Sequence, residues 1–223
     1  MLMEIPRLLS AEEVRRLREL ADKGQTVDGK ATAGEHVRHL KNNLEIQLER
    51  KYAIEVDTTV RSALRNNELF QDFAHPRLIA PPILNRYEPG MEYGEHMDNA
   101  FATIQGQVMR TDMSVTVFLS DPDSYEGGNL RLETPVGEKQ VKLNAGDAVA
   151  YSTTMLHRVQ PVTAGARVAA ITWVQSYVRD AAKREILFDL HRLMKKARAR
   201  DKDSAETRSL FKTYLNLLKM WAD

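Results

Sequence analysis

The sequence predicts a mainly β fold with helices on both sides of the β region. Three observations support this class. Short segments alternate apolar and polar residues over the middle of the chain, Gly, Pro and Asp dominate the turns between them, and helical periodicity is confined to the two flanking regions. A chain of 223 residues can bury one sizeable core. Many short strands with such turns are typical of a sandwich or a jelly roll.

Residues 1–77 are predicted to form a helical region that packs on the β core. Ser10 and Glu13 form a capping box, and Gly24 ends the short helix that follows. From Asn43 to about Asn67 the pattern is helical, because apolar residues recur at every fourth position. This long helix is expected to cover one face of a sheet with Leu48, Tyr52, Val56, Val60 and Leu64.

Two segments of this region are predicted to lack regular structure. Residues 25–42 are polar and indicate a loop. The loop contains His36 and His39, which fit a solvated loop better than a metal site because no third ligand accompanies them. The string from Phe73 to Pro76 indicates a linker to the β region.

Residues 78–180 are predicted to form the β core. The stretch Arg167–Gln175 is the clearest strand, since β-branched and aromatic residues are frequent along it. Gly127 and Gly128 indicate a tight turn that enters a strand. The other expected strands contain Ile83, Asn85 and Tyr87; Met113, Val115, Val117 and Leu119; Leu130 and Leu132; Val141 and Leu143; and Val149 and Tyr151.

Residues 181–223 return to helical periodicity and predict an antiparallel helical hairpin. One apolar stripe begins at Ile186 and another at Leu210, with the charged string Lys195–Asp203 between them. Such stripes need a surface to pack on, so we expect the hairpin to shield the barrel or to build a homodimer. The charged string fits a solvated helix end better than a nucleic-acid contact.

Composition excludes several classes of function. The formal net charge is +1, so the chain lacks the broad basic surface of a nucleic-acid-binding protein. The absence of cysteine excludes disulfides, thiolate metal sites and a cysteine nucleophile. The sequence shows no signal peptide and no run of about 18 apolar residues that would suggest a membrane span. We therefore expect a cytoplasmic protein with neither nucleic acid nor membrane as a partner.

The candidate site is centred on the motif His96-Met-Asp98. On a strand, residues two positions apart project from the same face, so one short element can direct an imidazole and a carboxylate at one point. A second histidine, His157, follows in strand-like surroundings. Two histidines and one carboxylate on one face of a metal leave the opposite face open, as in non-haem Fe(II) oxygenases. The sequence thus predicts a metal site at His96, Asp98 and His157.

These residues and Arg167 resemble the iron- and 2-oxoglutarate-dependent dioxygenases, and more narrowly the bacterial PKHD-type hydroxylases of the PiuC and YbiX group. The resemblance extends over nearly the whole chain and implies a double-stranded β-helix, or jelly roll, as the core. It is carried by the strings Asn85-Arg-Tyr87, Gly94-Glu-His-Met-Asp-Asn-Ala100, Arg110-Thr-Asp-Met-Ser114, Phe118-Leu-Ser120, Gly127-Gly128 and Val178-Arg-Asp180.

The resemblance also implies the cofactors. Fe(II) is expected at the three ligands, 2-oxoglutarate is expected to bind it through its keto-acid end, and L-ascorbate is a candidate further cofactor. The far carboxylate of 2-oxoglutarate needs a cation, and Arg167 fits because guanidinium pairs bidentately with carboxylate. Tyr87 and Trp173 are candidate cosubstrate residues, and core packing explains each of them as well. Asp112 and Asp147 are candidate acceptors for the ring N–H groups of the ligand histidines, but turn capping fits Asp147 better.

The implied reaction is hydroxylation of a substrate, with release of succinate and CO₂ from 2-oxoglutarate. Asp98 favours hydroxylation, because related halogenases have a small residue in its place. The family label implies a peptidyl or prolyl substrate, and the iron-uptake setting of relatives implies a siderophore-related one. Two alternatives are a cupin-like metalloenzyme that uses another divalent metal without 2-oxoglutarate, and a non-catalytic jelly-roll binding module.

Overall fold

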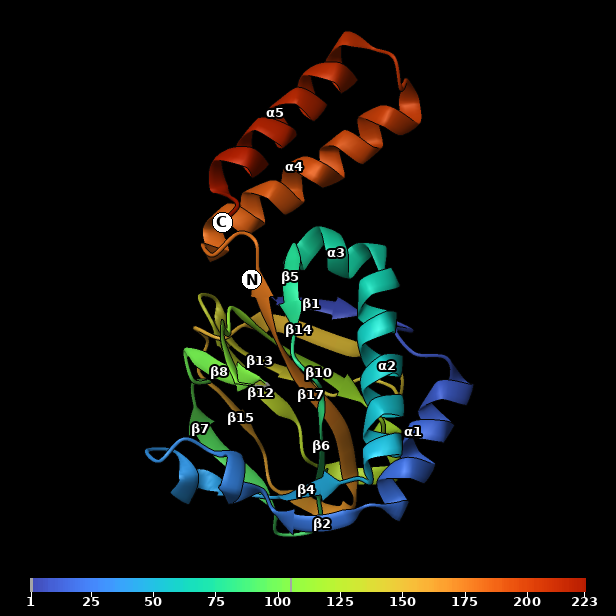
Figure 1. Cartoon of the computed structure of the whole chain (residues 1–223), viewed down its shortest axis with the longest axis vertical. Helices are drawn as coiled ribbons and strands as arrows, with labels where there is room; N and C mark the ends of the chain where they lie inside the picture. The colour runs from blue at the N-terminus through green and yellow to red at the C-terminus, as the bar shows by residue number, and fades with distance from the viewer. Residues whose placement is uncertain (1, 105) are drawn as a thin grey trace.

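The computed structural model describes residues 2–104 and 106–223 as two face-to-face antiparallel sheets with five helices (Figure 1). The prediction of a mainly β fold with flanking helices is confirmed. The helices are α1 (Ala11–Lys23), α2 (Arg50–Asn66), α3 (Glu68–Ala74), α4 (Ala181–Arg200) and α5 (Ala205–Trp221). In the described part of the chain, no helix combines the length and the apolar character needed to cross a membrane.

The larger sheet has eight strands and the smaller has five. In spatial order the larger contains β1 (Leu2–Ile5), β14 (Ala148–Ser152), β10 (Met113–Phe118), β17 (Arg167–Ser176), β6 (Ile83–Tyr87), β4 (Leu44–Gln47) and β2 (Gln25–Asp28), with β5 (Pro76–Ile79) also paired to β17. The smaller contains β13 (Gly137–Val141), β12 (Leu130–Thr134), β15 (His157–Val159), β7 (Glu92–His96) and β3 (Lys41–Asn42). Two two-stranded sheets complete the fold: the hairpin of β8 (Phe101–Ile104) with β9 (Gln107–Arg110), and the pair of β11 (Tyr125–Gly127) with β16 (Val162–Gly165).

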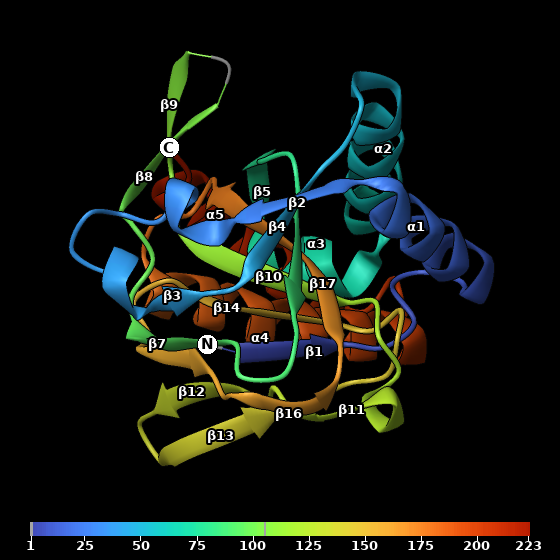
Figure 2. The same ribbon diagram turned by 90° about the horizontal axis from the view of Figure 1, so that it is seen from below.

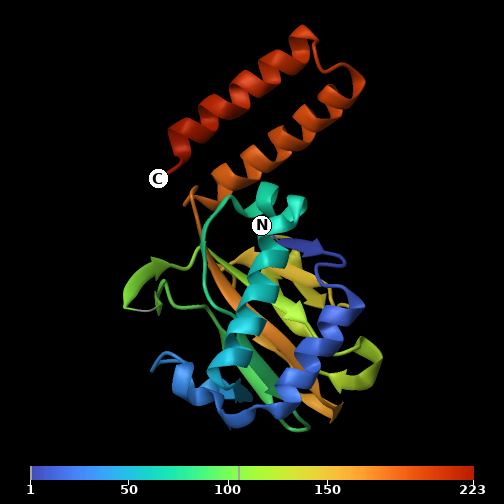
Figure 3. The ribbon, with the colours of Figure 1, turned by 45° about the vertical axis from the view of Figure 1, so that its right-hand side comes forward.

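The larger sheet is buried on both faces, and strand alternation separates the two. Along β10, Met113, Val115 and Val117 belong to the core that α1, α2 and α3 cover. Figure 3 shows α1 and α2 lying across this outer face. The intervening Phe118 belongs to a second core between the two sheets. Because residues two apart share a face, the polar Ser114 and Thr116 turn inward with Phe118, where they border the cavity described below.

The N-terminal region differs from the sequence-based expectation in three places. Residues 25–42 are not a loop throughout, because they contain β2, two short 3-10 helices (Gly29–Thr32 and Arg38–Leu40) and β3. The predicted long helix starts too early, because Leu44–Gln47 forms strand β4 and pairs with both β2 and β6. Tertiary pairing on both sides outweighs the helical pattern there. The expected linker is also partly helical, since Phe73 is buried in α3. The capping box at Ser10 and the buried stripe of α2 are confirmed.

The C-terminal hairpin, α4 and α5, projects from one end of the barrel (Figures 1 and 3). It meets the rest of the chain at α3, where the rings of Phe188 and Phe73 pack edge to face at 5.6 Å. The antiparallel hairpin is confirmed, but the charged string mostly belongs to α4, which runs to Arg200. The hairpin does not shield the sheets, and large apolar side chains on it are exposed: Ile186 by 50%, Leu193 by 55%, Phe211 by 49% and Met220 by 74%.

Candidate metal centre and its cavity

Two neighbouring strands bring the two candidate histidines together. His96 on β7 and His157 on β15 are directly paired in the antiparallel register, and their ring centroids lie 4.3 Å apart. Asp98 lies past the end of β7, so it is not a strand residue as expected, but its Oδ1 still comes within 3.9 Å of His157 Nε2. The three residues each offer a ligand atom, all within 4.8 Å of one another. The predicted triad therefore converges.

An irregularity in the pairing of β7 with β15 shapes this site. The register shifts between His157, which pairs with His96, and Val159, which pairs with Tyr93. In a regular strand, residues three apart point to opposite faces. The bulge turns Tyr93 to the same side as His96, and the two rings stack at 3.6 Å. Tyr93 thereby restricts the rotation of the His96 imidazole.

Backbone carbonyls orient both imidazoles in the same way. His96 Nδ1 donates to the carbonyl of Gly94 at 2.8 Å, and His157 Nδ1 donates to the carbonyl of Met155 at 3.0 Å. A carbonyl can only accept, so the proton lies on Nδ1 and each Nε2 keeps its lone pair for a metal. The candidate role of Asp112 as an acceptor of these protons is wrong, and Asp147 has the turn-capping role that the sequence favoured for it. Asp112 pairs with Arg110, and Asp147 caps a turn through the amide of Arg7.

The electrostatics of the cluster fit a divalent cation. Burial, with a further contribution from the neighbouring His157, lowers the pKa of His96 to about 3, so this imidazole is neutral at physiological pH. Asp98 Oδ2 is buried and has no hydrogen-bond partner within residues 2–104 and 106–223. Buried carboxylates normally find partners. Two imidazoles and one unpartnered carboxylate are the donor set that Fe(II) takes in a facial triad.

The triad lies in a cavity of about 360 Å³. Its walls are the inner faces of both sheets, and it is bordered by the segment from Thr32 to Val37 and by β8. Figure 2, seen from below, shows the chain between β2 and β4 and the β8–β9 hairpin on the same side of the barrel. His36 and His39 are exposed and do not belong to the ligand cluster, as expected.

Arg167 is the most unusual residue of the cavity wall. Only 1% of it is exposed, yet its Nε and Nη1 have no hydrogen-bond partner among the described residues. Its guanidinium lies over the rings of Tyr87 at 5.2 Å and Phe118 at 5.4 Å. Gly128, with a φ of +63°, makes room, because a Cβ there would approach Arg167 Cδ to 3.1 Å. A buried cation without a counter-charge indicates a place for an anion.

Tyr87 and Trp173 both reach the cavity. Tyr87 pairs with Arg167 in register, and burial raises its pKa to about 12, so its hydroxyl stays protonated and able to donate. Trp173 lines the cavity with an indole Nε1 that is buried and lacks a partner in the described part of the chain. Arg167, Ile171 and Trp173 alternate along β17 and all line the cavity, so one face of this strand forms part of its wall.

Sequence reasoning missed three residues, two that line the cavity and one that lies beside Arg167. Lys41 on β3 and Glu45 on β4 form a buried ion pair of 2.7 Å that joins the two sheets and lines the cavity. Their spacing of four suggests nothing beyond a helix pair, and their burial depends on sheet pairing. Tyr125 lies beside Arg167, since both would contact a Cβ at Gly128, and its buried hydroxyl has no partner among residues 2–104 and 106–223.

Comparison with protein families and curated proteins agrees with this geometry. The 2OG-Fe(II) oxygenase superfamily matches residues 82–175, and the PKHD-type hydroxylase C-terminal domain matches residues 181–223. A PKHD-type hydroxylase of Burkholderia ambifaria is 44% identical, with 100% of both chains covered. One from Thermosynechococcus vestitus is 41% identical with the same coverage.

Solved structures show the same fold at low sequence identity. A prolyl-4-hydroxylase from Pseudomonas putida gives a TM-score of 0.53 at 21% identity, over 78% of this chain and 92% of that one. HygX from Streptomyces hygroscopicus, solved with nickel, 2-oxoglutarate and hygromycin B, gives a TM-score of 0.55 at 14% identity, over 78% and 82% of the two chains. The matches along its full length place the chain in the 2OG-Fe(II) oxygenase superfamily and, within it, among the PKHD-type hydroxylases.

Proposed function

We propose that the cavity binds Fe(II) through His96, Asp98 and His157, holds the far carboxylate of 2-oxoglutarate against Arg167, and hydroxylates a substrate beside them. The observation that carries the proposal is the buried guanidinium of Arg167, which has unpartnered nitrogens among the described residues and shares one cavity with the ligand cluster. Leaving such a charge unpaired is costly. A dicarboxylate cosubstrate provides the missing partner.

Each residue has a distinct task. The histidines direct their Nε2 atoms at the metal, because the carbonyls of Gly94 and Met155 bind their Nδ1 atoms. Asp98 offsets part of the metal charge, and Arg167 fixes the far end of 2-oxoglutarate so that its keto acid faces the triad. Bound Fe(II) supplies the oxidation chemistry that converts 2-oxoglutarate and O₂ to succinate and CO₂ while a substrate C–H bond is hydroxylated. Sheet walls on both sides keep bulk water out.

Two donors support Arg167 in this proposal. The ring of Tyr87 lies under the guanidinium, and the ring of Tyr125 lies next to the Arg167 side chain. Burial raises the pKa of both tyrosines, which keeps each hydroxyl a donor to a carboxylate. Truncation of Tyr125 to Phe should therefore weaken 2-oxoglutarate binding by roughly tenfold, the effect of one hydrogen bond to a charged group.

The cavity-lining residues outside the metal and 2-oxoglutarate sites indicate what kind of substrate could bind. Lys41 and Glu45 offer a donor and an acceptor side by side, while Met97 and Phe101 expose apolar surface near the cavity. An amide group matches the polar pair, and peptidyl-proline and many siderophores contain one. We therefore propose an amide-containing substrate from one of these two classes. The membership in the superfamily favours this reading over the cupin-like and non-catalytic alternatives.

The proposal is tested with Arg167→Ala and Arg167→Lys, measuring succinate formation and iron content on the same preparations. Losing one partner of a buried charge pair costs about 2–5 kcal/mol, so Arg167→Ala should raise the KM for 2-oxoglutarate by roughly 30-fold or more. Arg167→Lys keeps the positive charge but loses the bidentate guanidinium, so its KM for 2-oxoglutarate should be intermediate. Iron should stay near the wild-type content.

The matched control is Arg158→Ala, on the same strand as His157 but paired with the surface residue Glu138. It should leave the KM for 2-oxoglutarate unchanged. A wild-type KM in Arg167→Ala would overturn the cosubstrate assignment. Acceleration of succinate formation by a prolyl peptide or by a hydroxamate siderophore, each added separately, distinguishes the two substrate classes.

A further inference from the structure

Residues 97–100, the metal loop, connect β7 to β8 and carry Asp98. Thr111 anchors this loop twice. Its amide donates to the carbonyl of Ala100 at 3.1 Å, and its hydroxyl donates to the carbonyl of Asn99. Both carbonyls belong to residues that directly follow Asp98, and Thr111 is buried. The position of the Asp98 carboxylate therefore depends on Thr111.

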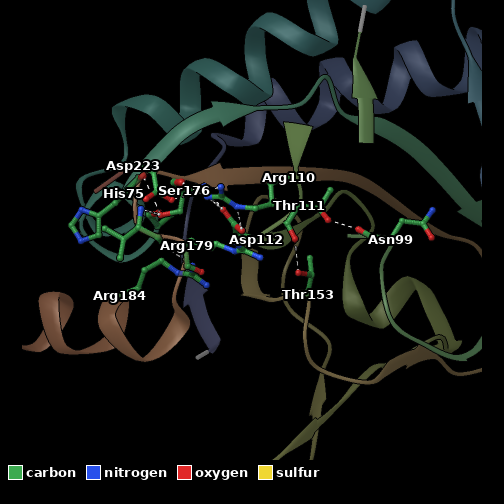
Figure 4. A network of polar contacts seen from close by, with 12 residues as sticks. His75, Asn99, Arg110, Thr111, Asp112, Thr153, Ser176, Arg179, Arg184 and Asp223 are labelled. Atoms are coloured by element: carbon green, nitrogen blue, oxygen red, sulfur yellow. Dashed lines mark hydrogen bonds and ion pairs between the residues drawn. The ribbon is translucent and has the colours of Figure 1, made fainter. Parts of the chain in front are cut away.

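Thr111 is fixed in turn by a network of polar contacts (Figure 4). The Thr153 hydroxyl donates to the Thr111 carbonyl at 2.6 Å. The next residue, Asp112, accepts from Arg110 through Nε at 2.7 Å and Nη2 at 3.0 Å, and from the Ser176 amide at 2.9 Å. A buried carboxylate with three donors, two of them charged, is held firmly.

The same network reaches the C-terminal hairpin. Val178 donates its amide to Ser176 Oγ at 3.0 Å, and Arg184, fully buried in the first turn of α4, donates Nη1 to the Val178 carbonyl at 2.8 Å. Beyond α5, the Asp223 carboxylate lies 3.8 Å from Arg110 Nη1. Figure 4 shows Ser176, Arg184 and Asp223 on one side of Asp112 and Asn99 of the metal loop on the other.

We propose that Thr111 and Asp112 are positioning residues for Asp98, and that through them the C-terminal hairpin sets the metal affinity of the cavity. The proposal rests on Asp98 being a ligand, as proposed above. Unlike the two histidines, Asp98 has no strand pairing to hold it, so the loop needs outside support. Contacts behind a metal ligand typically change metal affinity by about 10- to 100-fold.

The test compares Thr111→Val with Thr172→Val by anaerobic titration with Fe(II). Thr172 is the matched control, because it is a fully buried threonine whose hydroxyl donates to a backbone carbonyl, that of Ala80, at 2.6 Å. Thr111→Val should raise the Kd for Fe(II) by about tenfold, while Thr172→Val should not change it. Hydrogen exchange of residues 97–100 in the metal-free protein should be faster only in Thr111→Val. Equal Fe(II) affinity in the two variants would overturn the proposal.

The coupling to the hairpin is tested with Asp112→Asn and Arg184→Lys. Both should weaken Fe(II) binding, whereas Asp72→Asn, which breaks the contact of α3 with Lys195 on α4 outside the network, should not. Wild-type affinity in both network variants would overturn the role of the hairpin. Asp98→Ala separates the two proposals. If it binds Fe(II) normally, the ligand assignment fails, and if it loses Fe(II) while Thr111→Val does not, only the present inference fails.

Discussion

The cavity and the C-terminal hairpin both contain groups without partners, but the groups are polar and buried in the cavity and apolar and exposed on the hairpin. Around the cavity, polar atoms of Asp98, Arg167 and Trp173 are buried without partners in the described part of the chain. On the hairpin, large apolar side chains such as Leu193 and Phe211 are exposed. Buried polar atoms call for a small polar ligand, whereas a set of exposed apolar groups is typical of a protein contact surface. The predictions below test each side of this contrast.

The largest effect is expected from removing a cavity ligand. His96→Ala and His157→Ala should each lose most of the bound iron and reduce succinate formation to background, because two protein ligands hold Fe(II) poorly. Metal analysis of anaerobically reconstituted protein provides the measurement. His36→Ala is the control, since this exposed histidine is outside the ligand cluster. Full iron retention in both ligand variants would contradict the assignment of His96 and His157 as metal ligands.

Two phenylalanines of the hairpin should differ in their contribution to stability. Phe188 is 6% exposed and packs on Phe73, so Phe188→Ala should lower the free energy of unfolding by about 3–5 kcal/mol. Phe211 is 49% exposed, and Phe211→Ala should change it by less than about 1 kcal/mol. Chemical denaturation measures both. A similar loss in the two variants would show that α5 is covered as well as α4.

The stability of the protein should depend on pH through His75, which directly follows α3, the helix that contacts the C-terminal hairpin. Burial lowers the pKa of His75 to about 4 from 6.5, so the unfolded chain binds a proton between these values and the native state does not. Stability contributed by the neutral ring is present above pH 6.5 and falls by roughly 2–3 kcal/mol as the pH drops to 4.

His75→Asn isolates this contribution, because asparagine tolerates the left-handed backbone at φ 43° and does not titrate. Unfolding free energies measured from pH 7 to pH 4 should fall less steeply in this variant than in the wild type. The difference between the two proteins removes the effect of other groups. Parallel curves would show that His75 is not the titrating group.

The smallest effect on the single chain should come from the exposed face of the hairpin. Phe211→Asp and Leu193→Asp should each lower its unfolding free energy by about 1 kcal/mol, since both side chains are half exposed and Asp is a poor helix former. If the hairpin forms the expected homodimer, light scattering should show the mass fall to that of one chain. Val136→Asp, at a fully exposed apolar residue of the barrel, is the control. A wild-type mass in both hairpin variants would contradict the homodimer.

Sequence reasoning selected His96, Asp98, His157 and Arg167 from their residue types, the short spacing of His96 and Asp98, and the family resemblance, and the structure brings all four to one cavity. It could not find Lys41, Glu45 or Tyr125, whose roles arise from the pairing of distant strands. It also placed the acceptors for the histidine protons on carboxylates, whereas backbone carbonyls two residues before each histidine take that role. Every residue has a backbone carbonyl, so the sequence cannot show which carbonyl accepts the histidine proton, and only the structure identifies it.

The direct pairing of His96 with His157 also has a consequence for folding. Two strands far apart in the chain must meet in one register before both imidazoles face the cavity. A slip of one residue would turn one of them to the opposite face of the sheet. Fe(II) therefore binds the correctly paired sheet in preference to any shifted form, and by mass action it selects that register. Metal binding therefore stabilises the native pairing of β7 with β15, in addition to any role in the reaction.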